Sequence, residues 1–117
     1  MTWTISFYVD EYGRVPVGRW LNELSPAKRE LFARFVSETV EVRGPTLLET
    51  PLLKSLGSGL SELRIRGRLS GVGQEALLRV CVCSHCWCFA SPLQHQRNHY
   101  VFNDELSGGN LFELFDL

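Results

Sequence analysis

The sequence contains almost no lysine and no excess of charge of either sign. Only Lys28 and Lys54 are lysines among twelve basic residues, which stand against thirteen acidic ones. The formal net charge of −1 excludes the overall basicity of many nucleic-acid-binding proteins, so any nucleic acid would have to be bound by a local cluster of cations. The other ten basic residues are arginines, whose planar guanidinium groups suit bidentate contacts with phosphate or carboxylate.

Long apolar runs are also lacking. No stretch approaches the roughly 18 consecutive apolar residues of a membrane-spanning helix, and the first residues lack the positive region and cleavage site of a signal peptide. We therefore expect a cytoplasmic protein with no membrane partner. Hydrophobic residues make up 44% of the chain, which is enough for the core of one domain over residues 1–117.

Apolar periodicity and turn residues predict an α+β protein with the element order β-α-α-β-β-β. The alternating segments that predict strands are residues 2–9, 60–68, 76–84 and 86–90. Pro16 and Ser25-Pro26 are typical of helix starts, and Gly44-Pro45 is expected to end the second helix. Dense glycine and proline predict an irregular loop over residues 44–59, and a polar loop is expected over residues 94–100.

One apolar stripe on the first strand and another on the two helices are expected to bury each other. Trp3, Ile5 and Phe7 share one side of the predicted strand. The helical residues expected to cover them are Trp20, Leu24, Phe32 and Phe35. If Phe35 is central to this contact, Phe35→Ala should lower the free energy of unfolding by about 3–5 kcal/mol.

Two motifs carry a resemblance to a known family. Residues 15–24 contain the pattern P-V-x-x-W-L-x-x-L, and residues 51–65 read PLLKSLGSGLSELRI. Their order and spacing resemble the phage-derived branch of the RelE/HigB toxin superfamily over about residues 5–66, and the segment 59–64 is the most specific part. The resemblance implies a helical hairpin on a curved antiparallel sheet. It also implies a ribosome-dependent mRNA endonuclease that needs no cofactor and is neutralised by a co-encoded antitoxin.

The sequence departs from the family pattern after the second predicted strand. Residues 91–94 read SPLQ where the family has a lysine pair, and residues 101–117 contain four acidic residues and no basic one. We therefore treat residues 94–117 as a divergent tail. The alternative function is a non-catalytic inhibitor, encoded by a phage or mobile element, that binds a host protein complex.

Metal-independent RNA cleavage needs a base, a cation that holds the phosphate, and an acid. Arg64, Arg66 and Arg68 alternate along one predicted strand and face away from the core, and Arg79 can join them from the next strand. These four arginines are the candidate RNA-phosphate ligands. We predict that Arg64, Arg66 and Arg79 share one exposed concave surface with the segment 94–100, as the sheet order implied by the resemblance requires. The alternative is a solvated sheet surface, paired in part with Glu62.

The polar segment after the last predicted strand holds the candidate catalytic residues. His95, Arg97 and His99 lie where the resemblance implies the catalytic end of the toxin, and histidine titrates close enough to neutrality to act as base or acid. Tyr100 is the candidate for stacking on an RNA base. A polar loop without a catalytic role is the alternative.

Four cysteines lie within eight residues and could suggest a zinc site. Cys81, Cys83, Cys86 and Cys88, with His85, supply enough thiolate and imidazole for zinc. Paired ligand knuckles separated by a longer loop are absent from this spacing. The alternative, four small buried hydrophobic residues, is the usual state of free cysteine, so we predict no metal site.

Overall fold

The protein is described by a computed structural model that covers the backbone of residues 2–96 and 99–102 and the side chains of residues 2–93. Helices pack against a mixed sheet, which confirms the α+β class. The strands in sheet order are β1 (Ser6–Phe7), β5 (Cys88–Gln96), β4 (Glu75–Cys83), β3 (Leu60–Arg68) and β2 (Leu53–Gly57), and β6 (His99–Phe102) pairs with β5.

The expected all-antiparallel sheet is wrong at one edge. β1 pairs with β5 in the parallel direction, whereas the other neighbouring strands are antiparallel. The chain leaves β1, passes through the helices and enters the sheet again at its far edge with β2. This crossing leaves β1 to pair with a strand from late in the chain, whose direction is set by the β3–β4–β5 meander.

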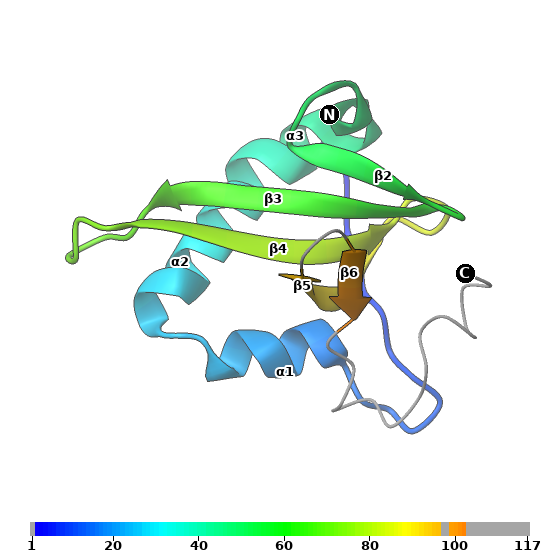
Figure 1. The fold of residues 1–117 in the computed structure, drawn as a ribbon, viewed down its shortest axis with the longest axis horizontal. Helices are drawn as coiled ribbons and strands as arrows, with labels where there is room; N and C mark the ends of the chain where they lie inside the picture. The colour runs from blue at the N-terminus through cyan, green and yellow to red at the C-terminus, as the bar shows by residue number, and fades with distance from the viewer. Residues whose placement is uncertain (1, 97–98, 103–117) are drawn as a thin grey trace.

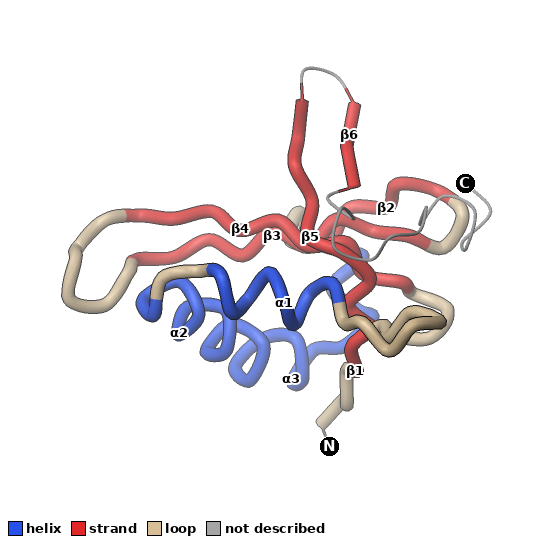
Figure 2. Tube along the Cα trace, turned by 90° about the horizontal axis from the view of Figure 1, so that it is seen from below, coloured by secondary structure: helices blue, strands red, loops and turns tan. Residues whose placement is uncertain are grey.

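The helices cover one face of the sheet, and the β5–β6 hairpin projects from the other (Figures 1 and 2). The predicted helix starts are confirmed: α1 (Pro16–Glu23) begins at Pro16, and Ser25 caps α2 (Pro26–Phe35) by accepting a hydrogen bond from Lys28 N at 3.3 Å. The face of the sheet opposite α1 and α2 carries the residues from which the candidate site is built.

The second helical run continues to Gly44, as predicted, but contains a π-helical segment. Val36–Val40 form this segment and Glu41–Arg43 (α3) complete the run, which stops at Gly44 with a φ of 58°. A Cβ at Gly44 would come within 2.5 Å of the Trp3 ring, so glycine is also required here by space.

The irregular loop expected over residues 44–59 is wrong. A 3₁₀ helix over Gly44–Glu49 and strand β2 occupy most of it. Glycine and proline here begin and end short elements instead of preventing them: Pro45 lies at the start of the 3₁₀ helix, and Gly57 and Gly59 flank the β2–β3 turn.

Strand β3 matches its predicted span, and β4 differs from its prediction by one residue at each end. Strand β5 begins two residues later than predicted and runs on to Gln96, so the loop expected over residues 94–100 is wrong. There β5 pairs with β6, with His95 opposite Tyr100. The hydrogen bonds between β5 and β6 join backbone groups, so a strand can form here although the side chains are polar. The prediction was wrong because it relied on side-chain polarity alone.

The main core lies between the helices and the sheet. The Phe32 ring packs against Trp20 and Phe89, with centroid distances of 6.1 and 5.2 Å. Ile5 packs against this core as expected, but the Trp3 and Phe7 side chains are 44% and 39% exposed.

The first strand is much shorter than the predicted span of residues 2–9. Trp3 N donates to Glu41 O at 2.6 Å, so this part of the chain bonds to the helical layer instead of the sheet. The predicted packing of the first stripe is therefore confirmed for Ile5 and only partly for its neighbours. Phe35 is only partly buried against the core, so the condition for its large predicted effect on stability is not met.

A second, smaller cluster lies on the sheet face opposite the helices. Its buried members are Leu60, Cys81, Cys83, Cys88, Ala90 and Leu93. Tyr8 and Leu56 pack against it. Both faces of this end of the sheet are therefore covered by apolar side chains, and the arginines lie further along β3 and β4.

Candidate functional site

The β3–β4 register places Arg64 directly opposite Arg79. Leu63 and Ile65 are buried in the core beneath the helices, so the alternating residues Arg64 and Arg66 face the other way. Because residues opposite each other in an antiparallel pair share a face, Arg79 lies on the same face as these two arginines. The predicted common face of Arg64, Arg66 and Arg79 is confirmed.

A buried carboxylate holds two of these arginines in place. Glu62 is 0% exposed, and its Oε1 accepts a hydrogen bond from Arg64 Nε at 2.5 Å. Arg79 Nε lies 3.7 Å from Glu62 Oε2. Two like charges directly across a strand pair repel each other, and the carboxylate between them offsets that repulsion.

The two paired arginines still reach the surface. Their side chains are 37% (Arg64) and 36% (Arg79) exposed, whereas the Glu62 side chain is 1% exposed. A buried anion thus anchors two partly exposed cations, which restricts their rotamers before any ligand arrives. The pairing with Glu62 considered in the sequence analysis is present, but its carboxylate is buried and not part of a solvated surface.

Arg66 and Arg68 continue this line of cations along β3. Both are exposed, and they extend the line of cations along β3 beyond the pair, Arg64 and Arg79, that contacts Glu62. Guanidinium groups bind phosphate oxygens through two parallel N–H bonds, so this face can hold neighbouring phosphates of an RNA chain. We call the surface formed by Arg64, Arg66, Arg68 and Arg79 the arginine face.

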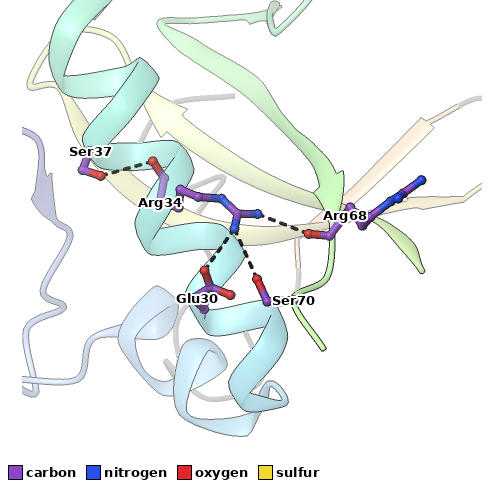
Figure 3. A network of polar contacts seen from close by, with 5 residues as sticks. All are labelled: Glu30, Arg34, Ser37, Arg68 and Ser70. Atoms are coloured by element: carbon purple, nitrogen blue, oxygen red, sulfur yellow. Dashed lines mark hydrogen bonds and ion pairs between the residues drawn. The ribbon is translucent and has the colours of Figure 1, made fainter. Parts of the chain in front are cut away.

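One further arginine fixes the end of β3, and its role was not predicted from the sequence. Arg34 of α2 donates to the carbonyl oxygen of Arg68 at 3.2 Å and to Glu30 Oε1 at 3.0 Å, and it lies 3.5 Å from Ser70 Oγ. Figure 3 shows the Arg68 guanidinium pointing away from this network. Arg34 therefore holds the β3–β4 turn against α2 and leaves the Arg68 side chain free to extend. The Glu30–Arg34 spacing of four residues on a helix was the available signal.

The predicted catalytic residues lie beyond the described side chains. The backbone places His95 in β5 opposite Tyr100 in β6, and His99 opposite Gln96, so both histidines belong to one hairpin. Arg97 lies outside the described residues. That these residues share a surface with the arginine face stays a prediction.

The cysteines are divided between the interior and the surface. Cys81, Cys83 and Cys88 are buried, which fits the small-hydrophobic interpretation, whereas Cys86 is exposed. Burial raises the pKa of the Cys81 thiol to about 12, so this residue is a neutral thiol at pH 7. Among the residues that the structure describes, no three His, Cys, Asp or Glu side chains are grouped so that they could hold a metal ion.

None of the helices in the described part of the chain is long and apolar enough to span a membrane.

Comparisons with protein-family models, with curated proteins and with solved structures found no match. Function is therefore inferred from the arginine face and from the residue motifs.

Proposed function

We propose that the protein is the toxin of a toxin–antitoxin pair and acts as a ribosome-dependent mRNA endonuclease. The observation that carries the proposal is the cross-strand pair Arg64 and Arg79, held by the buried Glu62 carboxylate on the sheet face away from the helices. Such a pre-organised pair of guanidinium groups suits a phosphate whose negative charge increases in the transition state.

The sequence motifs support the same proposal. The most specific part of the resemblance to RelE/HigB toxins, residues 59–64, contains Glu62 and Arg64. The remaining residue of the network, Arg79, stands opposite Arg64 on β4. The segment that resembles the toxin family therefore supplies two of the three residues that form the charged network.

The proposed chemistry divides the roles between the arginine face and the hairpin. Arg64, Arg66, Arg68 and Arg79 hold RNA phosphates, and Tyr100 stacks on a base. His95 and His99 act as base and acid, with Arg97 as an additional cation. This chemistry needs no cofactor, and the partners are mRNA on the ribosome and a cognate antitoxin protein.

The test uses the full chain with purified ribosomes and a translated message. We expect cleavage at codon-phased positions, mapped from the new 5′ ends, and growth arrest when the chain is expressed in a bacterium. Arg79→Ala should lower the cleavage rate by about 10²-fold or more, the typical loss when one electrostatic donor is removed. Arg19→Ala, an exposed arginine on α1, is the matched control and should leave the rate unchanged.

A second candidate function is a non-catalytic inhibitor of a host protein complex. Residues 101–117 contain Asp104, Glu105, Glu113 and Asp116 and no basic residue, which disfavours RNA at this end of the chain. Absence of cleavage by the wild-type chain, together with tight binding to a host protein, would exclude the endonuclease and support this second function.

A further inference from the structure

The turn between β4 and β5 brings thiols together. Cys86 Sγ lies 3.0 Å from Cys88 Sγ, and Cys83 stands directly opposite Cys88 in the β4–β5 pair. Cys86 is exposed, whereas the other two residues are buried. A reagent from solution can therefore reach one sulfur of the close pair directly.

The backbone between the two close sulfurs has an unusual conformation. Trp87 has a φ of 51°, in the left-handed region that bulky residues rarely adopt. Such backbone outliers persist only where the surrounding structure holds them in place, and they gather at functional positions. An outlier of this kind between two sulfurs in contact is a second observation, independent of their distance.

Hydrogen bonds hold this turn from both sides. The Ser84 backbone N–H and the Ser84 hydroxyl both donate to the Gly59 carbonyl oxygen, at 2.7 and 2.8 Å. On the other side, Ser6 N donates to the Trp87 carbonyl oxygen at 3.3 Å. The turn is therefore fixed by the β2–β3 turn and by β1, and the two sulfurs are kept near each other without a covalent link.

We propose that Cys86 and Cys88 form a dithiol that closes reversibly to a disulfide by exchange with a low-molecular-weight disulfide such as oxidised glutathione. The Cys86 thiolate attacks one sulfur of the reagent, which forms a mixed disulfide and releases one glutathione thiolate. The Cys88 sulfur then attacks Cys86 and displaces the second glutathione. The two cysteines lose two protons and two electrons in total, and the reagent gains them as it becomes two thiols.

Proximity, not thiolate activation, drives this exchange. Cys86 is exposed as a residue, but partial desolvation of its thiol is the largest cause that raises its pKa above the ordinary value, and burial likewise raises the pKa of Cys88. Both groups are therefore mainly protonated at pH 7, and the first attack is slow there and faster at alkaline pH. The second attack is intramolecular, between atoms that are already in contact, so the mixed disulfide does not accumulate.

The test treats the full, reduced chain with oxidised glutathione and then unfolds it in guanidinium chloride, so that N-ethylmaleimide can reach and block every free thiol, including the buried ones. The protein is then reduced and labelled again with the deuterated reagent. Trypsin cleavage after Arg79 and Arg97 gives a peptide with all four cysteines, and its fragmentation spectrum reads each label. We expect the deuterated label on Cys86 and Cys88 and the light label on Cys81 and Cys83.

Two variants sharpen the assignment. Cys86→Ser removes an exposed thiol and should slow the loss of thiols at least tenfold. Cys81→Ala removes a buried thiol outside the close pair and should leave the reaction unchanged. Circular dichroism checks that each variant folds, and the label pattern of the wild-type chain decides the question if either does not.

Each contrary result overturns the proposal. A deuterated label on Cys83 and Cys88 would assign the disulfide to the cross-strand pair instead. A stable glutathione adduct on Cys86, a disulfide between two chains, or four light labels would show that the two sulfurs do not close on each other. None of these outcomes depends on RNA cleavage, so a negative result here would not count against the proposed endonuclease, and the absence of cleavage would not count against the disulfide.

Discussion

Phe32 is the aromatic residue on which the contact between helices and sheet depends. It is 5% exposed and lies between the Trp20 ring of α1 and the Phe89 ring of β5. We expect Phe32→Ala to lower the free energy of unfolding by about 3–5 kcal/mol, because the truncation leaves a cavity between three elements. Phe35→Ala, at a partly buried position one helical turn later, is the control and should cost clearly less. Urea titrations that give equal losses would contradict this view of the core.

Asp10 makes the stability of the first turn depend on pH. Tyr12 N and Arg14 N donate to its Oδ1 at 2.9 and 2.8 Å, and Arg14 Nε donates to Oδ2 at 3.0 Å. Burial by itself raises the pKa of Asp10, but these hydrogen bonds and the Arg14 charge outweigh it and hold the pKa below the ordinary value of 3.8.

The direction of the pH effect follows from this lowered pKa. The stabilisation is complete above the unfolded-state value of 3.8 and disappears as the pH falls through the lower folded-state value. Asp10→Asn should therefore be less stable than the wild-type chain at pH 7, and the difference should shrink as the pH approaches 2. Urea titrations of both chains between these limits measure it, and a difference that does not change with pH would exclude the ionised Asp10 as its source.

At the scale of elements, Leu31 of α2 packs directly against β3 at Gly67. A Cβ at this position would lie 2.6 Å from Leu31 Cδ1, and Leu31 is only 2% exposed. Gly67→Ala should lower the free energy of unfolding by about 1–3 kcal/mol through overpacking. Leu31→Val removes the opposing methyl group, so the double variant should be more stable than the sum of the single losses predicts. Additive losses in this double-mutant cycle would show that α2 and β3 do not meet here.

The arginine face is formed by two strands, β3 and β4, and the RNA binding proposed for it should depend on salt concentration. Arg66 is exposed and lies beyond the pair held by Glu62, so its removal should not affect folding. Arg66→Ala should reduce the slope of log affinity against log salt concentration by about 0.7, the value for one phosphate contact of a single strand. Arg43→Ala, on α3, is the control and should leave the slope unchanged. Equal slopes for wild type and Arg66→Ala would exclude a phosphate contact at this position.

For the whole molecule, the net charge of −1 means that the proposed RNA binding has to come from a small surface and not from general attraction. The proposed cleavage would then depend on a few groups near that surface. His95→Ala or His99→Ala should lower the cleavage rate by about 10²-fold or more, because general acid–base groups contribute roughly 10²–10⁴. Initial rates with ribosomes and a translated message measure the effect. Rates within a factor of two of wild type for both variants would remove the histidines from the mechanism.

Part of the candidate site could be predicted from the sequence because it depends on strand periodicity. Alternation alone places Arg64 and Arg66 on the outward side of β3, and the structure confirms both. Alternation does not indicate how much of a side chain is covered, so Glu62 was expected on a solvated surface and is buried instead. The Glu30–Arg34 spacing indicates a helical ion pair, but the contact of Arg34 with β3 could not be predicted because its partner there, the Arg68 carbonyl oxygen, lies 34 residues away in the chain.

The sequence by itself determined the features that depend on neighbours along the chain. Pro16, Ser25 and Gly44 mark where the helical segments start and stop because caps and backbone conformation are local, and the alternation of residues 60–68 marks β3 for the same reason. Only the tertiary structure decided that β1 lies parallel to β5, that Arg64 faces Arg79 across a buried carboxylate, and that Cys86 touches Cys88 in a fixed turn. These features arise where strands distant in the sequence pair with each other. Which strands pair, and in which register, depends on how the whole sheet is buried against the helices, so the sequence of one strand alone does not determine it.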